Sequence, residues 1–349
     1  MNKPTPQPGR GAVSSAPGRF ATRYNEPEDA AGPAPDTHLH DERAVSIVSR
    51  NRSPDVPFEQ SLNPYRGCEH GCVYCYARPT HSYLDLSPGL DFESEIFVKT
   101  NAADRLRETL MNPRYECRPI TIGANTDAYQ PAERSRRVTR GVLEVLAEFR
   151  HPFSVITKSA LIERDLDILG EMAADGLCSV AVSVPTLQDD VKRLLEPRTP
   201  SAARRLRTIE RLVAAGVPVT LMLAPVIPAL TDHEIERILA AAAAAGADRA
   251  TWVLLRLPHE VAPLFREWLE AHYPQRAARV MSLVRQSRGG RDYDPAWGRR
   301  QRGTGEYAAL IARRFAVARR RAGYGEGERQ LDTSRFRRPH PAGQLALTL

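Results

Sequence analysis

Two patterns of apolar residues alternate through the middle of the chain. Short apolar runs predict buried strands, and each is followed by a segment whose apolar side chains recur as on one face of a helix. The expected strands cover 58–63, 119–123, 153–157, 179–184, 217–223 and 250–254, and the expected helices cover 102–111, 137–149, 166–175, 201–215, 232–245 and 262–272. Repeated strand–helix units are typical of a parallel sheet with helices on its outside.

The two ends of the chain lack this alternation. Residues 1–45 are rich in Pro, Gly, Ala and charge without an apolar period, so we predict a disordered arm. A short strand is expected at 44–48, at the start of a core that covers 46–275. Residues 276–325 are expected to be a basic extension that packs on the core through a helix at 307–320, and 326–349 a flexible tail.

Composition and charge narrow the class of protein. The chain has 349 residues and 42% apolar residues, enough for a substantial core. No apolar run approaches about 18 residues, so we expect no membrane span, and the first residues lack the apolar stretch of a secretory signal. Residues 275–349 hold 17 Arg, no Lys and 6 acidic residues. Such a region can meet a polyanion, although a solvated helix face in an arginine-rich chain explains it equally well.

Three of the 5 cysteines lie close together on one polar loop: Cys68, Cys72 and Cys75. Three thiolates on one short loop can hold three corners of a cubic iron–sulfur cluster, whereas electron-carrying [4Fe–4S] sites ordinarily use four cysteines. A cluster with three protein ligands leaves one iron open to bind a cofactor. The alternatives are a structural zinc site, with His70 or His81 as the fourth ligand, and three unrelated buried thiols. A disulfide framework is disfavoured by the size of the chain and the missing secretory signal.

The spacing Cys-x3-Cys-x2-Cys, with Tyr74 just before the last cysteine, resembles the signature of the radical S-adenosylmethionine (SAM) superfamily. The resemblance implies an α/β fold, a partial (β/α)6 TIM-like barrel with its chemistry at the carboxyl ends of the strands. It also implies that Cys68, Cys72 and Cys75 ligate a [4Fe–4S] cluster whose open iron binds SAM. Reductive cleavage of SAM then gives a 5′-deoxyadenosyl radical that abstracts hydrogen from a substrate. Tyr74 is expected beside the adenine of SAM.

Longer segments make the resemblance more particular. Residues 61–68, 76–81, 125–134 and 157–159 resemble an uncharacterised bacterial group of radical SAM proteins related to spore photoproduct lyase. This resemblance implies the cofactors, while the substrate and the net reaction stay open.

Polar residues follow three successive expected strands, where ligand sites of such folds collect. Many radical SAM enzymes carry Gly-Gly-Glu-like residues after the second strand, whereas this chain has Asn125, Thr126 and Asp127 there. Lys158 follows the third strand and Ser183 ends the fourth. The placement resembles the spore photoproduct lyase branch, so these five residues are the candidates for binding SAM. An ordinary polar loop, with Asp127 as a helix cap, is the alternative.

One departure from that branch concerns the return of a hydrogen atom. The lyase carries a hydrogen-donating cysteine just before the tip of the second strand, and this chain has none near that position. Cys117 and Cys178 are expected at the opposite end of the barrel, as small buried apolar residues. Repair of a thymine lesion in the same way would require a tyrosine, such as Tyr76 or Tyr129, to return the hydrogen atom.

The expected partners follow from the cofactors and the C-terminal region. Reduction of a cluster implies a donor such as flavodoxin or ferredoxin, and an oxygen-sensitive cluster suits a reducing cytoplasm. The segment Gln344 to Leu349 resembles the peptide that docks bacterial DNA-processing proteins on the replication sliding clamp. The tail and the basic region favour DNA as substrate over a protein or small molecule. Two other functions stay open: a cluster-containing nucleic-acid-binding or redox-sensing protein without SAM chemistry, and a zinc-stabilised interaction module.

Overall fold

The expected alternation builds one curved sheet in the computed structural model, which describes residues 6–20 and 36–339. Its parallel strands pair with one another in the order in which the chain forms them. They are β3 (Gln60–Leu62), β6 (Ile120–Ile122), β7 (Phe153–Thr157), β8 (Cys178–Ser183), β9 (Val219–Val226) and β10 (Arg249–Leu254). The short strand β2 (Val48–Arg50) adds to β3 in the antiparallel direction.

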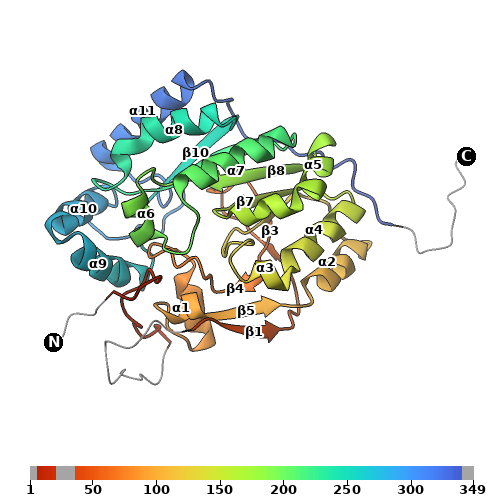
Figure 1. The fold of residues 1–349 in the computed structure, drawn as a ribbon, viewed down its shortest axis with the longest axis horizontal. Coiled ribbons are helices and arrows are strands. Elements are labelled where there is room, and N and C mark those ends of the chain that lie inside the picture. Colours follow the sequence, from red (N-terminus) through yellow and green to blue (C-terminus); the bar gives the residue numbers. More distant parts are fainter. Residues whose placement is uncertain (1–5, 21–35, 340–349) are drawn as a thin grey trace, which may run out of the picture.

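Helices cover the outer face of this sheet (Figure 1). The helices that follow the strands are α2 (Ala102–Met111), α4 (Val138–Glu148), α5 (Leu166–Ala174), α7 (Ala202–Ala214), α8 (Ile235–Ala244) and α9 (Val261–His272). Their apolar positions are buried in the core beneath them, as Leu106, Leu146 and Leu212 show. Every expected strand–helix unit is present, so the predicted α/β fold of a partial (β/α)6 barrel is confirmed.

A second, smaller sheet lies below the barrel in Figure 1 and contains a strand that the sequence did not predict. Its strands are β1 (His38–Glu42), β5 (Glu95–Lys99) and β4 (Tyr65–Arg66), with β5 in the middle. β1 falls within the arm that we expected to be disordered. Its Leu39 packs against a small apolar cluster, while His38 and His40 contact the carboxylate of Glu95 at 2.9 and 2.6 Å. Because most of this strand is polar, the apolar pattern could not reveal it.

The strand expected at 44–48 is displaced along the chain to β2, Val48–Arg50. The side chain of Asn101 makes the hydrogen bonds to the Ala44 backbone that a neighbouring strand would otherwise make. Its Oδ1 accepts from Ala44 N at 2.8 Å, and its Nδ2 donates to Ala44 O at 3.0 Å. The backbone of Ala44 is therefore satisfied without a strand.

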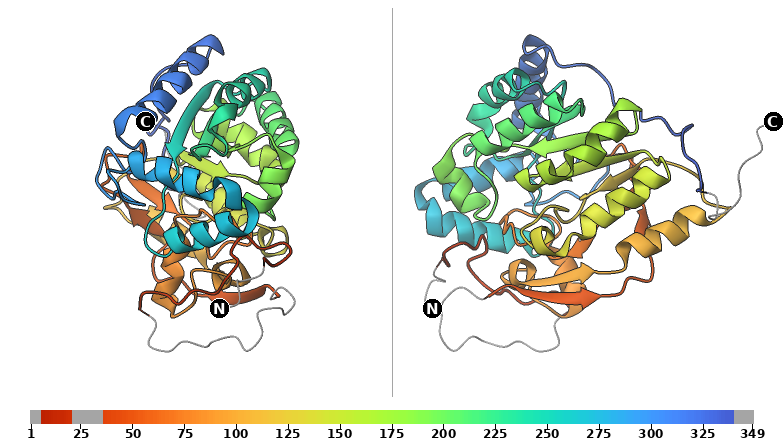
Figure 2. Two further views of the ribbon diagram at one scale, coloured as in Figure 1. Left: turned by 90° about the vertical axis from the view of Figure 1, so that its left-hand side faces the viewer. Right: turned by 45° about the vertical axis from the view of Figure 1, so that its right-hand side comes forward.

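The remaining helices are shorter or lie beyond the barrel. The short ones are α1 (Asp91–Ser94), α3 (Glu133–Arg136), α6 (Asp189–Leu195) and the 3-10 turns η1 (Arg78–Leu84), η2 (Ala160–Asp165) and η3 (Asp232–Glu234). The extension forms α10 (Pro274–Gln286) and α11 (Gly305–Arg321), and α11 packs along α8 in Figures 1 and 2. No helix in the described parts of the chain is long and apolar enough to cross a membrane.

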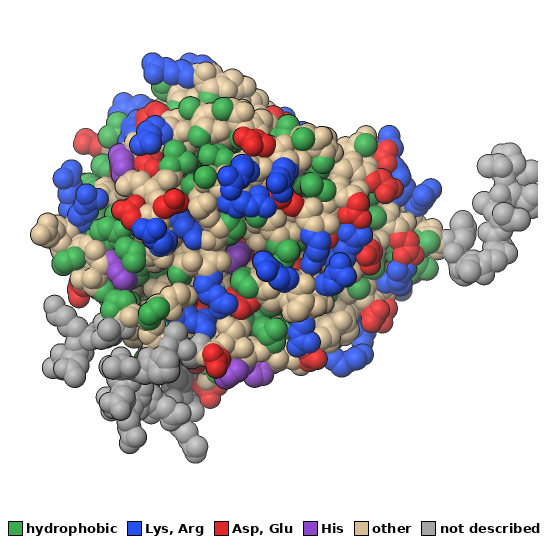
Figure 3. All heavy atoms as spheres, viewed as in Figure 1, with side chains coloured by type: hydrophobic (Ala, Val, Ile, Leu, Met, Phe, Trp, Pro, Cys, Tyr) green, Lys and Arg blue, Asp and Glu red, His purple; other side chains and the backbone are tan. Residues whose placement is uncertain are grey.

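The C-terminal extension closes the open side of the barrel and then crosses its end. At the edge strand β10, Leu254 N donates to Gln301 O at 2.8 Å, and Arg300 pairs with Asp55 from the opposite edge. Beyond α11 the chain descends along the barrel (Figure 2), and Arg337 N donates to Phe149 O at 3.0 Å. This part of the predicted flexible tail is therefore packed, whereas the domain boundaries themselves stay a prediction. On the face shown in Figure 3, basic and acidic side chains are interspersed.

Candidate active site

A cavity of about 1110 Å³ lies inside the curved sheet. Alternate residues of the strands face it, because successive side chains of a strand point to opposite faces. Ser154 and Ile156 of β7 line it, as do Thr220 and Met222 of β9. At one end the wall is formed by the cysteine loop, and it includes all three of its cysteines: Cys68, Cys72 and Cys75. The structure thus brings the expected metal ligands together on one wall.

Backbone hydrogen bonds fix the cysteine loop from two sides. Cys68 N donates to Phe92 O at 2.9 Å, and Val73 N donates to Leu195 O at 3.1 Å. Within the loop, Cys75 N donates to Cys72 O at 3.2 Å. Burial, and then the nearby Glu196 carboxylate, raises the pKa of the Cys72 thiol to about 12. A metal centre that binds this thiol as a thiolate must therefore displace a firmly held proton.

Asp127 lines the cavity with a carboxylate that protein donors already occupy. Its Oδ1 accepts from Thr157 Oγ1 at 2.7 Å and from Tyr129 N at 2.9 Å. Its Oδ2 accepts from Lys158 N at 2.8 Å and lies 3.3 Å from Nδ1 of His70. Burial alone would raise the pKa of Asp127, but His70 and these donors hold it well below the usual range. Asp127 thus joins the cysteine loop to the tips of two neighbouring strands.

Lys158 places a positive charge on the cavity wall at the tip of β7. Burial would lower its pKa, but the carboxylates of Glu196 and Asp127, together with Cys72 when it is ionised, outweigh burial and raise it. The side chain is therefore held as an ammonium group next to a cysteine of the loop. Ser183, at the end of β8, lines the same cavity.

Asn125 and Thr126, the two residues before Asp127, make different contacts. Asn125 lines the cavity, and its backbone N donates to Asn63 Oδ1 at 2.8 Å. Thr126 is buried outside the cavity lining, and its hydroxyl donates to Tyr65 O at 2.9 Å. The structure therefore brings Asn125 to the cavity and uses the Thr126 hydroxyl to hold the loop onto β4.

Glu196 is a buried residue beside the cavity that bonds to the cysteine loop. Its carboxylate accepts from the Tyr74 hydroxyl and from Arg205, whose Nη1 also donates to Ser183 O at 2.9 Å. Two residues further along the chain, Arg198 pairs with Glu69 of the cysteine loop at 3.1 Å. The residues in these pairs are not three or four positions apart in the sequence, as neighbours on one helix face would be. No sequence pattern could therefore have identified the pairs.

The two tyrosines considered for hydrogen return occupy different places. Tyr76 lines the cavity and is 41% exposed. Its hydroxyl donates to Ala124 O, and the guanidinium carbon of Arg256 lies 4.8 Å from its ring centroid. Tyr129 lies in the core at 1% exposure, and its hydroxyl donates to Asp165 Oδ2 at 3.0 Å. The structure does not bring Tyr129 to the cavity.

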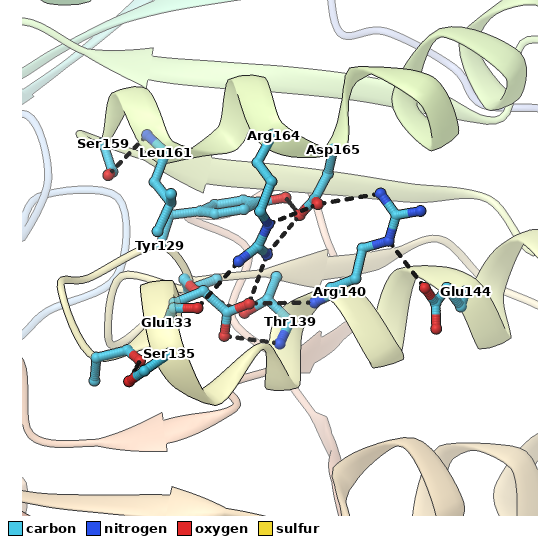
Figure 4. Close-up of polar contacts among 12 residues, drawn as sticks. Tyr129, Glu133, Ser135, Thr139, Arg140, Glu144, Ser159, Leu161, Arg164 and Asp165 are labelled. Atoms are coloured by element: carbon cyan, nitrogen blue, oxygen red, sulfur yellow. Dashed lines mark hydrogen bonds and ion pairs between the residues drawn. The ribbon is translucent and has the colours of Figure 1, made fainter.

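The surroundings of Tyr129 form a polar network around the buried carboxylates of Glu133 and Asp165 (Figure 4). Arg164 donates to Asp165 and, at 2.7 Å, to Glu133 Oε1. Glu133 Oε2 also accepts from the backbone N of Thr139 at 3.0 Å, near the start of α4. A carboxylate at this position compensates the exposed N–H groups of the first helical turn. The network therefore serves to fix α3 and α4.

The histidines proposed as zinc ligands are engaged elsewhere. Nε2 of His81 lies 2.9 Å from Glu95 O, and burial lowers the pKa of His81 to about 4. His70 faces Asp127. Across residues 6–20 and 36–339, no three His, Cys, Asp or Glu side chains converge as ligands of a single ion. The cysteines of a cubic cluster need not converge, because each binds a different iron, so the loop fits such a cluster. The ammonium group of Lys158 fits a cofactor that carries a carboxylate.

Comparisons with known proteins identify a family for this chain, an uncharacterised relative and solved structures of similar fold. Residues 62–242 match the Radical SAM superfamily. An uncharacterised protein of Mycobacterium tuberculosis is 40% identical over 232 residues, which cover 66% of this chain and 68% of that protein.

The similar solved structures include spore photoproduct lyase complexed with dinucleoside spore photoproduct. The TM-score is 0.58 at 15% identity, over 82% of this chain and 80% of that chain. A mutant of the lyase with bound AdoMet and the same dinucleoside has a TM-score of 0.53 at 17% identity, over 81% of this chain and 77% of that chain. At such identities the likeness is one of fold.

Proposed function

This chain belongs to the radical SAM superfamily and is a radical SAM enzyme, and we propose that Cys68, Cys72 and Cys75 hold a [4Fe–4S] cluster used for the reductive cleavage of SAM. The observation that carries the proposal is that these thiols and Lys158 share the wall of one cavity inside the sheet. When bound, the cluster and SAM supply the electron and the radical that begin hydrogen-atom abstraction. The protein orients these groups and encloses them.

The residues for SAM come from the strand tips. Lys158 suits the carboxylate of SAM or its ribose hydroxyls, because its ammonium group is on the cavity wall beside Cys72. Ser183 and Asn125 offer a hydroxyl and an amide on the same wall. Tyr74 also lines the cavity, and its hydroxyl is tied to Glu196, so its backbone is the part available to the adenine.

Asp127 and Thr126 act through position. Because protein donors already occupy the Asp127 carboxylate, we assign it the alignment of Lys158, from whose backbone N it accepts at 2.8 Å. The Thr126 hydroxyl is bound to Tyr65 O, so we assign Thr126 the holding of the loop.

The substrate class that best fits the cavity is anionic, with DNA as our preferred polymer. Seven arginines line the cavity, against five acidic residues: Arg118, Arg249, Arg256, Arg302, Arg319, Arg320 and Arg329, against Asp55, Glu59, Asp127, Glu326 and Glu328. Guanidinium groups suit phosphates. Tyr76 is the tyrosine positioned to return a hydrogen atom to such a substrate, since it lines the cavity and Tyr129 does not.

Two expected partners remain proposals. Reduction of the cluster needs an electron donor of the flavodoxin or ferredoxin kind in a reducing cytoplasm. The clamp-like segment from Gln344 to Leu349 lies outside the described residues.

The proposal is tested by incubating the anaerobically reconstituted protein with SAM and dithionite and measuring 5′-deoxyadenosine. We expect its formation by the wild type and by Cys117→Ala, since Cys117 is outside the cavity lining, and its loss in Cys72→Ala. A protein that contains iron and sulfide yet forms no 5′-deoxyadenosine would instead support the redox-sensing or nucleic-acid-binding alternative. Zinc without iron would support the interaction module.

A further inference from the structure

An N-terminal segment lies in direct backbone contact with the cysteine loop. A Cβ atom added to Gly11 would lie 1.7 Å from Gly71 O and 3.1 Å from Val73 N. Such distances leave no room for any side chain at position 11, so only glycine permits this approach. Gly11 stands well before residues 62–242, which match the superfamily. The contact therefore involves a segment outside the matched region.

A buried carboxylate joins the segment to the loop through hydrogen bonds. Glu93 accepts from Ala12 N at 2.8 Å through Oε1 and from Gly11 N at 3.0 Å through Oε2. Oε1 also pairs with Arg78 Nη2 at 2.5 Å. Nε of Arg78 in turn donates to Cys72 O at 2.9 Å. A chain of contacts thus runs from Gly11 to the carbonyl of a cysteine in the proposed cluster site.

This chain of contacts is shielded from solvent and has little tolerance for rearrangement. Arg78 and Glu93 are both 0% exposed, so each buried charge needs the other as its partner of opposite sign. A Cβ on Gly71, whose φ is +66°, would meet Glu93 Oε2 at 2.7 Å. Glu93 therefore touches both glycines, and displacing the segment would leave two of its hydrogen-bond sites unfilled.

The segment is also anchored beyond the loop. Ala12 packs in a small apolar cluster with Leu90 and Leu264, the latter from α9. Ser14 Oγ donates to Glu267 Oε2 at 2.6 Å, again on α9. The segment thus links the cysteine loop to a helix of the barrel.

We propose that residues 10–14 are part of the cluster site and act as a brace that holds the cysteine loop closed over its metal centre. The proposal rests on the proposed function, because it concerns the cluster that Cys68, Cys72 and Cys75 would hold. Gly11 and Glu93 are positioning residues in this proposal. They act on the loop through its backbone and through Arg78, and they touch neither SAM nor substrate.

The test uses Gly11→Ala and Gly11→Val in the full-length protein, with Gly141→Ala as control. A Cβ on Gly141 meets only Ala103 Cβ at 3.6 Å, an ordinary contact. The readouts are iron and sulfide per chain after anaerobic reconstitution, and the rate at which the visible absorbance of the cluster bleaches in air. We expect bleaching in Gly11→Val to be about tenfold faster, the change given by about 1.4 kcal/mol of lost local stability. Gly141→Ala should bleach at the wild-type rate.

Amide hydrogen exchange of the metal-free protein gives an independent readout. Faster exchange at Val73 and Cys75 in Gly11→Ala, with unchanged exchange in β7 and β8, is the expected pattern. Wild-type bleaching and wild-type exchange in both Gly11 variants would overturn the brace. If the wild-type protein itself takes up no iron and sulfide, the proposed function fails, and exchange alone decides whether the segment holds the loop.

Discussion

The hydroxyl of Tyr74 donates a buried hydrogen bond to the carboxylate of Glu196. This bond joins the cysteine loop to the chain that follows α6, and the backbone bond from Val73 N to Leu195 O lies beside it. Glu196 is at the same time the partner of the buried Arg205. Tyr74, a residue of the cysteine motif itself, therefore attaches the cysteine loop to the barrel.

Replacing Tyr74 with Phe removes that attachment and leaves the ring in place. We expect a loss of about 1.5 kcal/mol in the free energy of unfolding, as for a hydrogen bond to a charged group. Urea denaturation of the metal-free protein measures this. Tyr83→Phe is the control, because Tyr83 is 68% exposed. Equal stability of the Tyr74 variant and the wild type would show that the bond contributes nothing.

Lys158→Met removes the positive charge beside Cys72. If Lys158 binds the carboxylate or ribose of SAM, the dissociation constant of SAM should rise by about 10- to 100-fold, which corresponds to one charge-assisted hydrogen bond. Anaerobic equilibrium dialysis against the cluster-loaded protein measures it. Lys99→Met, outside the cavity lining, should bind SAM as the wild type does. Unchanged affinity in Lys158→Met would remove Lys158 from the SAM site.

The two tyrosines should respond differently to replacement by Phe. Tyr129→Phe deprives the buried Asp165 of a hydrogen bond and should cost about 1–2 kcal/mol of stability, while 5′-deoxyadenosine formation continues. Tyr76→Phe should change stability by less than about 0.5 kcal/mol, because the side chain is substantially exposed. Denaturation curves give the stability of each variant, and product assays on the same preparations give its 5′-deoxyadenosine formation. Loss of 5′-deoxyadenosine in a stable Tyr129→Phe would contradict the placement of this residue in the core.

Much of the barrel was predictable because its signals are local. The helix expected at 102–111 coincides with α2, and the strand expected at 153–157 coincides with β7. Apolar residues in each recur with the period of the element. By contrast, α10 was missed, because only Val280, Met281 and Val284 are buried along its arginine-rich length.

Features that depend on contacts between residues far apart in the chain could not be predicted from the sequence. The Gly- and Pro-rich stretch around Gly11 has the composition of a disordered arm, yet small residues are what the close backbone contact with Gly71 requires. The same limit applies to Glu196, whose partners Tyr74 and Arg205 come from different elements. Contacts with distant residues also decide which polar residues after β6 face the cavity. Asn63 accepts from the backbone N of Asn125, and Tyr65 O accepts from the Thr126 hydroxyl.

Two buried histidines should make the protein sensitive to mild acid. Burial lowers the pKa of His81 and of His151 to about 4, so between pH 6.5 and about pH 4 the unfolded chain binds more protons than the folded one. Stability should therefore fall as the pH falls, by about 1.5 kcal/mol for each histidine between pH 6.5 and about pH 5.

Denaturation curves of His81→Gln across this range test the effect. Its stability should fall less steeply than that of the wild type, because the glutamine takes up no proton. His233→Gln, with an exposed side chain, should retain the wild-type slope. A wild-type slope in His81→Gln would contradict the assignment.

The central claim is that three cysteines leave one iron of a cluster open for SAM. Electron paramagnetic resonance of the anaerobically reconstituted, dithionite-reduced protein tests it most directly. We predict a [4Fe–4S] signal in the wild type and in Cys117→Ala that changes when SAM is added, and its absence in Cys72→Ala. A signal that SAM leaves unchanged, or one that survives in Cys72→Ala, would contradict the claim.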